Sequence, residues 1–140
     1  MRSELTTLEL HLLDAACVPL WAAFGSTYLV GTAQRGGSYR DVDVRTILDD
    51  DEFDRLFGDE AGQQRWELLC VVIGQQLSHV TGLPVDYQIQ CMTEANAKYD
   101  GMRNPIGVNR SYAAGGDATP WTPKAERARR EAEAGPEAVQ

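Results

Sequence analysis

The chain has 140 residues, of which 43% are hydrophobic, a composition that fits one folded domain and argues against wholesale disorder. Because its formal net charge is −8, strong non-specific binding to nucleic acid is not expected. Cys17, Cys70 and Cys91 are far apart among apolar neighbours, which argues against disulfides or a zinc site and favours buried thiols in a cytoplasmic protein.

The first predicted element is a helix that begins with a capping box formed by Thr6 and Glu9. Pro19 is expected to kink this helix or to begin a second one, which stops at Gly25. The apolar stretch 12–24 is short and interrupted by charge, so it predicts neither a membrane span nor a signal peptide. No membrane partner is therefore expected.

Two predicted strands follow, with a glycine-rich turn between them. The run of β-formers at 27–30 predicts a buried strand, and the turn covers 31–37. Segment 41–48 begins with strict alternation, because Asp41 and Asp43 fall on one face and valines on the other. That pattern is typical of a half-buried strand.

The next segments predict three helices and one more strand. The acidic run 49–52 is interpreted as the start of a short helix rather than as a metal site. A long helix over 63–80 carries a continuous apolar stripe, and 84–90 alternates as a strand with Asp86 on its polar face. A short helix over 93–99 follows. The stripe of the long helix consists of Trp66, Leu69, Cys70, Ile73, Leu77 and Val80.

The order of these elements predicts an α+β fold with a small mixed sheet of three or more strands flanked by helices. We place this domain at 1–111. The remaining segment, 112–140, is rich in turn residues and mixed charges and predicts a flexible polar tail with at most a frayed helix.

Carboxylates on two of the predicted strands suggest a metal site. Acids at positions i and i+2 of one strand lie about 6–7 Å apart by Cα, raise each other's pKa and need a positive partner. Mg²⁺ together with nucleotide phosphates would provide it, and Asp86 on a neighbouring strand would complete a clamp with Asp41 and Asp43. The sequence leaves open whether Arg45, on the same face, pairs with an aspartate or contacts a substrate.

The glycine-rich turn is a candidate phosphate site. Gly31 and Thr32 end a predicted strand with exposed backbone N–H groups and a hydroxyl, which can hold a terminal phosphate without side-chain bulk. Arg35 and Arg40 lie between this turn and the acids, where their guanidinium groups would neutralise phosphate charge.

The runs GTAQRG at 31–36 and RDVDV at 40–44 resemble the signature of the DNA polymerase β-type nucleotidyltransferase superfamily. The resemblance covers roughly 24–90 and implies the nucleotidyltransferase fold. It also implies that a nucleoside monophosphate moves from an NTP such as ATP to a hydroxyl acceptor by in-line attack, with pyrophosphate leaving. The acceptor class is left open among a partner protein, a tRNA and a small molecule.

The resemblance also implies roles for individual residues. Gly31 and Thr32 would hold the β- and γ-phosphates, with Thr32 in the place of the family's usual serine. Asp41 and Asp43 would bind two Mg²⁺ ions, for which Mn²⁺ is an alternative. Asp86 would help to bind one ion and would act on the attacking hydroxyl.

The chain departs from the family by having no evident second domain for a base and an acceptor. In size it is closer to minimal nucleotidyltransferases, some of which are antitoxins that adenylylate a partner toxin. Segment 99–107 has no counterpart in the family pattern, and we interpret its Arg103 and Asn104 as part of a turn. Two alternatives to an enzyme stay open, a catalytically silent binding module resembling an antitoxin and a structural or assembly protein. The sequence does not indicate the oligomeric state.

Overall fold

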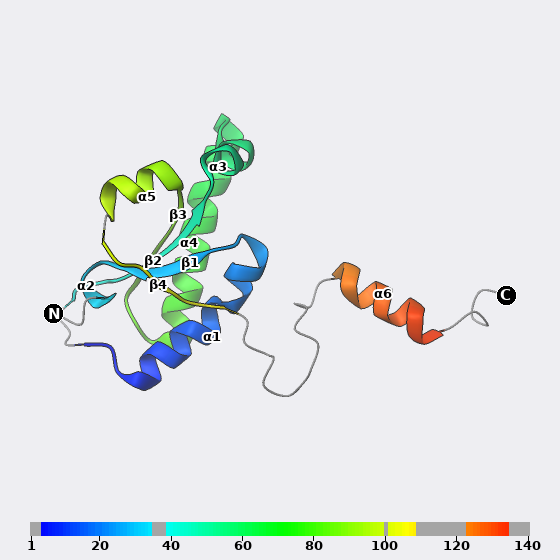
Figure 1. The fold of residues 1–140 in the computed structure, drawn as a ribbon, viewed down its shortest axis with the longest axis horizontal. Helices are drawn as coiled ribbons and strands as arrows, with labels where there is room; N and C mark the ends of the chain where they lie inside the picture. The colour runs from blue at the N-terminus through cyan, green and yellow to red at the C-terminus, as the bar shows by residue number, and fades with distance from the viewer. Residues whose placement is uncertain (1–3, 35–38, 100, 109–122, 135–140) are drawn as a thin grey trace. The chain divides into compact units, whose positions relative to one another are not determined.

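A four-stranded mixed sheet in the order β3-β2-β1-β4 organises the first part of the chain (Figure 1). β1 (Thr27–Val30) is antiparallel to β2 (Val42–Leu48), which is parallel to β3 (Val85–Cys91). The short β4 (Asn104–Pro105) pairs with β1. Because a parallel pair needs a long crossover, the chain between β2 and β3 forms two helices. This is the predicted α+β fold, a small mixed sheet flanked by helices.

This computed structural model describes most of the chain. The chain divides into two units, 1–108 and 109–140. No helix among the described residues is both long enough and apolar enough to cross a membrane. The described residues are 4–34, 39–99, 101–108 and 123–134.

The first helix, α1 (Thr7–Ala23), begins with the predicted capping box. The hydroxyl of Thr6 accepts a hydrogen bond from the Glu9 N–H, and the Glu9 carboxylate accepts one from the Thr6 N–H. Pro19 does not begin a second helix, because α1 continues through it to Ala23. Buried residues on both sides of the proline, Leu13 and Leu20, pack into one core and hold the two halves together.

The crossover consists of α3 (Asp50–Phe57) and α4 (Glu60–Thr81). Most of the predicted apolar stripe of α4 packs against the core, but Val80 is 47% exposed, so its assignment to the stripe was wrong. Thr81 turns inward instead, because it lies one helical turn beyond the buried Leu77 and donates its hydroxyl hydrogen to the Leu77 carbonyl.

Helix α4 also covers the outer edge of β3, beside which no strand lies among the described residues. The Ser78 hydroxyl accepts a hydrogen bond from the Val85 N–H at 3.1 Å. The indole N–H of Trp66 donates to the Ile89 carbonyl at 2.8 Å. Because these side chains satisfy polar groups of the edge strand, α4 protects an edge that would otherwise be open to pairing with another chain.

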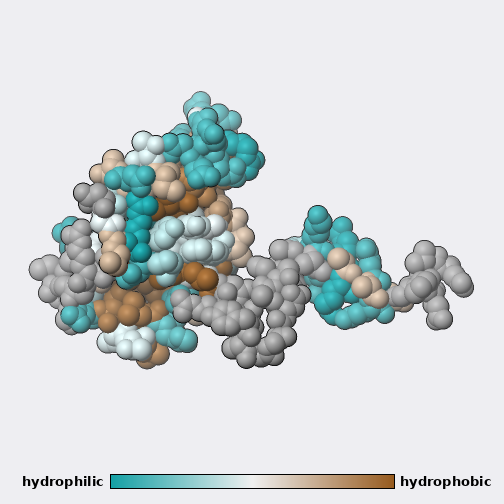
Figure 2. All heavy atoms as spheres, in the orientation of Figure 1, coloured by the Kyte–Doolittle hydropathy of each residue, from teal (hydrophilic) through white to brown (hydrophobic). Residues whose placement is uncertain are grey.

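The remaining helices are α2 (Gly31–Gln34), where only a turn was expected, α5 (Met92–Lys98) and α6 (Pro123–Ala134). α5 packs on β2 and β3. α6 is a helix of 12 residues where at most a frayed one was predicted. Along it Arg129 pairs with Glu126 and Glu133, and Figure 2 shows that its surface is largely hydrophilic.

The three cysteines are free thiols, but only Cys17 is fully buried. Burial raises the pKa of the Cys17 thiol to about 12, with a smaller contribution from the charge of Asp14. Cys70 and Cys91 are half-buried, so the expectation that all three are interior residues was correct only for Cys17.

Candidate functional site

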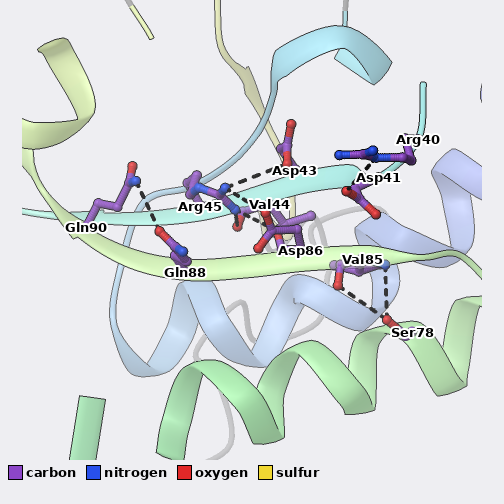
Figure 3. Close-up of polar contacts among 10 residues, drawn as sticks. All are labelled: Arg40, Asp41, Asp43, Val44, Arg45, Ser78, Val85, Asp86, Gln88 and Gln90. Carbon is purple, nitrogen blue, oxygen red and sulfur yellow. Dashed lines mark hydrogen bonds and ion pairs between the residues drawn. The ribbon is translucent and has the colours of Figure 1, made fainter. Parts of the chain in front are cut away.

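Three strand ends meet at one end of the sheet and bring the predicted acids together. Val30, the last residue of β1, pairs with Asp43 near the start of β2. Asp43 in turn pairs with Asp86 near the start of β3. Because β2 and β3 are parallel and in this register, the two carboxylates lie side by side on one face of the sheet (Figure 3).

Arg45 connects these two carboxylates. Its Nη2 atom is 3.7 Å from Asp43 Oδ1 and 3.3 Å from Asp86 Oδ2. Its Nη1 atom donates to the main-chain oxygens of Val44 and Asp86, at 3.0 and 2.6 Å (Figure 3). The residue is only 1% exposed. The question left open by the sequence is therefore answered in part, because Arg45 pairs with both aspartates.

The guanidinium of Arg45 also lies beside an aromatic ring. Its Cζ atom lies 5.7 Å from the ring centroid of Tyr99, which follows α5. The Nε atom of Arg45 is buried and has no hydrogen-bond partner among the described residues. With a burial this deep and contacts to two main-chain oxygens, Arg45 is a fixed cation of the site rather than a mobile one.

Asp43 remains short of positive charge in spite of Arg45. Burial raises the pKa of its carboxyl above the ordinary 3.8, the charge of Arg45 lowers it, and the neighbouring Asp86 and Asp41 raise it again. Lys98 makes a smaller lowering contribution. The net direction is upward, so the ionised carboxylate would gain from a further cation.

The backbone of Gly31 lies directly against Asp43. Gly31 has a φ of +76°, and a Cβ atom at this position would be 2.4 Å from Asp43 Oδ2. Only a residue without a side chain allows the main chain to come this close to the carboxylate. The glycine-rich turn and the acid strand, which are separate in sequence, are therefore in contact.

The other predicted site residues are less closely involved. Asp41 precedes β2 instead of beginning it, and its half-exposed carboxylate is 3.9 Å from Arg40 Nε. Arg35 and the side chain of Thr32 lie outside what the structure describes. Within the described ranges, no three His, Cys, Asp or Glu side chains are arranged as a metal-binding group.

A groove of about 640 Å³ lies between α4 and β3 and reaches Asp86. Its walls are mainly apolar with a few polar groups, a composition typical of small-molecule and cofactor sites. The residues that line it include Trp66, Val71, Ser78, Asp86, Tyr87 and Gln88.

Two residues at this site had no functional assignment from sequence. Tyr99 lies beside Arg45, and the charge of Lys98 acts on Asp43, only because α5 packs on β2 and β3. Their spacing from Asp43 in the chain carries no signal of this proximity.

Comparisons with known proteins give no independent indication of function. No family model, no curated protein and no solved structure matches the chain. Any functional assignment therefore rests on the chemistry of the strand ends.

Proposed function

We propose that residues 1–108 form a Mg²⁺-dependent nucleotidyltransferase that moves a nucleoside monophosphate from an NTP to a hydroxyl acceptor. The observation that carries the proposal is the meeting of Gly31, Asp43 and Asp86 at one end of the sheet. The main chain at Gly31 lies against Asp43, and the pKa of that carboxyl stays raised although Arg45 pairs with both Asp43 and Asp86.

The donor set fits a hard cation such as Mg²⁺ or Mn²⁺, which prefers carboxylate oxygens. Arg45 contacts Asp43 through Oδ1, while Oδ2 of the same carboxylate faces Gly31. Asp41, Asp43 and Asp86 are the residues that would hold the metal, while Arg45 would keep its contacts with Asp43 and Asp86. When bound, the metal would supply positive charge to the phosphates and to the leaving pyrophosphate.

The protein's own residues would divide the remaining work. The main chain at Gly31, with Thr32, would receive the terminal phosphates, and Arg40 with Arg35 would neutralise them. The acceptor hydroxyl would approach along the groove that reaches Asp86. As the hydroxyl oxygen attacks the α-phosphorus, Asp86 would take its proton, and the bond to pyrophosphate would break.

One observation favours a second candidate, a catalytically silent binding module. Arg45 pairs with both Asp43 and Asp86, so the positive partner that two adjacent acids require is already supplied by the chain. In that case the site would bind a nucleotide or a partner protein without turnover. Binding and turnover must therefore be measured separately.

The test uses titration calorimetry with ATP, GTP, CTP and UTP in Mg²⁺, followed by incubation of labelled nucleotide with protein, tRNA and small-molecule acceptors. We expect Asp43→Asn to abolish Mg²⁺-dependent binding. Asp51→Asn, an exposed acid in the first turn of α3, is the matched control and should bind normally. Binding without turnover would support the silent module. No binding of any NTP to the wild type would refute the nucleotidyltransferase and a nucleotide-binding module, and would favour a partner-binding or structural role.

A further inference from the structure

The ring of Tyr99 has two cations beside it. Arg45 Cζ lies 5.7 Å from the ring centroid and Lys98 Nζ lies 5.8 Å from it. Both distances are within the range of a cation–π contact. Through Tyr99, the last turn of α5 is thus placed beside the guanidinium that holds Asp43 and Asp86.

The position of this turn is fixed at both ends of α5. After the helix, Arg103 donates hydrogen bonds to the Tyr99 carbonyl at 3.1 Å and to Asn96 Oδ1 at 2.7 Å. At its start, the Thr93 N–H donates to the Asp50 carboxylate at 3.0 Å. Arg103, which the sequence placed in a simple turn, therefore helps to set the wall of the site.

The two cations beside Tyr99 differ in what they can do. Arg45 is 1% exposed and is committed to two carboxylates and two main-chain oxygens. Lys98 is exposed and makes no salt bridge within the part of the chain that the structure describes. Its charge nevertheless reaches Asp43, whose pKa it lowers. Of the two described cations at this ring, Lys98 is thus the one that can turn toward a ligand.

We propose that Lys98 binds a phosphate group of the nucleotide's triphosphate and forms the α5 side of the phosphate site. The inference rests on the proposed function, because it assigns a further residue to the same nucleotide. A lysine ammonium is a mobile point charge with three donors, which suits a phosphate whose position changes during transfer. Arg45 cannot be this phosphate ligand, because moving away from Asp43 and Asp86 would leave their two negative charges beside each other without a cation.

The chain offers an internal control, since Lys98 and Lys124 are its only lysines and Lys124 belongs to the 109–140 unit. The probe is pyridoxal phosphate, whose aldehyde condenses with a lysine amine to an imine and releases water. Borohydride then reduces the imine to a stable secondary amine, and peptide mass spectrometry reads the labelled position.

We expect Lys98 to be labelled several-fold more than Lys124, and pyrophosphate to protect Lys98 alone. Pyridoxal, which lacks the phosphate, should label both lysines alike. Equal labelling by pyridoxal phosphate, or labelling of Lys98 that pyrophosphate does not reduce, would overturn the inference.

ATP with Mg²⁺ separates this inference from the proposed function. Protection of Lys98 by both ATP and pyrophosphate supports the two together. Protection by pyrophosphate without protection by any NTP would keep the phosphate site and contradict the nucleotidyltransferase. In the full chain, Lys98→Gln should weaken binding of an NTP about tenfold, as loss of a charge-assisted contact predicts. Lys98→Arg should retain most of the affinity and Lys124→Gln all of it, whereas an NTP affinity unchanged in Lys98→Gln would contradict the inference.

Discussion

Strand β2 has carboxylates at both of its ends, and the two groups are in opposite electrostatic states. At the start of the strand, burial raises the pKa of Asp43, and Asp86 and Asp41 add to that effect. At the other end, hydrogen bonds from the N–H and hydroxyl of Thr93 hold the pKa of Asp50 below its usual value. Asp43 is thus short of positive or donor partners, whereas Asp50 is supplied with hydrogen-bond donors.

The second group contains the longer acidic run, 49–52. Within it, Glu52 pairs with Arg55 at 2.6 Å, and this contact lowers the pKa of Glu52. Figure 2 shows a hydrophilic surface over α3, where these acids lie in water at the start of a helix. The number of acids in a run therefore says little about cation binding. Burial and the partners of each carboxylate decide it.

The largest effect should come from removing the fixed cation of the first group. Arg45→Met leaves Asp43 and Asp86 facing each other without their shared partner. We expect a loss of about 2–4 kcal/mol in the free energy of unfolding, measured by urea denaturation, because the buried cation shared by two partly buried carboxylates is removed. Added Mg²⁺ should restore more stability to this variant than to the wild type.

The matched control at the other end is Arg55→Met, which removes the exposed partner of Glu52. Its urea midpoint should equal that of the wild type, since exposed pairs contribute little. If Arg45→Met were as stable as Arg55→Met, the two carboxylates would not need a counter-charge, and the contrast between the ends of β2 would fail.

The next largest effect concerns the contact between Gly31 and Asp43. Gly31 and Gly82 have nearly the same φ, +76° and +72°, but a Cβ at Gly82 meets nothing within 4 Å. Gly82→Ala should therefore cost only the backbone strain, about 1 kcal/mol. Gly31→Ala should cost about 2–3 kcal/mol, because its methyl group also displaces the Asp43 carboxylate. Mg²⁺-dependent NTP binding should be lost in Gly31→Ala and retained in Gly82→Ala. If Gly31→Ala still bound an NTP, the close contact between Gly31 and Asp43 would not be part of the site.

Much of the secondary structure is predictable because its signals are local. The capping box of Thr6 with Glu9 and the β-formers of β1 indicate their elements within a few residues. The alternation in β2 also places Arg45 on the acid face. What it does not indicate is the partner of Arg45, since that depends on the register of β2 against β3, and a register is a tertiary property.

Burial on the acid face shows the same limit. The alternation over 84–90 places Gln90 on the same polar face as Asp86, yet Gln90 is 1% exposed. α5 packs on β2 and β3 and covers part of this face, which no pattern within β3 can indicate. The candidate site was therefore predictable at Gly31, Asp43 and Asp86, and its α5 wall was not.

A smaller effect, with opposite signs at the two ends, is expected in the pH dependence of stability. The folded pKa of Asp43 is raised, so the wild type loses stability as the pH rises from about 3.8 through that pKa. The pKa of Asp50 is lowered in the folded state, so this residue contributes stability above pH 3.8. That stability is lost as the pH falls from 3.8 through the lowered folded-state pKa. Asp43→Asn should remove the first change and Asp50→Asn the second, in urea midpoints followed from acid to neutral pH. For each variant, the urea midpoint is subtracted from that of the wild type at every pH. If the two differences changed with pH in the same direction, the contrast between the two ends of β2 would be contradicted.

The smallest effect should follow from neutralising acids in the well-supplied group. Asp51→Asn combined with Glu52→Gln removes two charges from the start of α3, where the carboxylates are exposed or already paired. If Mg²⁺ binds at the start of β2, the rise in melting temperature that Mg²⁺ causes should be the same in this double variant as in the wild type. Asp43→Asn should abolish that rise. The reverse result, a rise that survives in Asp43→Asn and disappears in the double variant, would place the cation at the acidic run and remove the metal from the proposed nucleotide site.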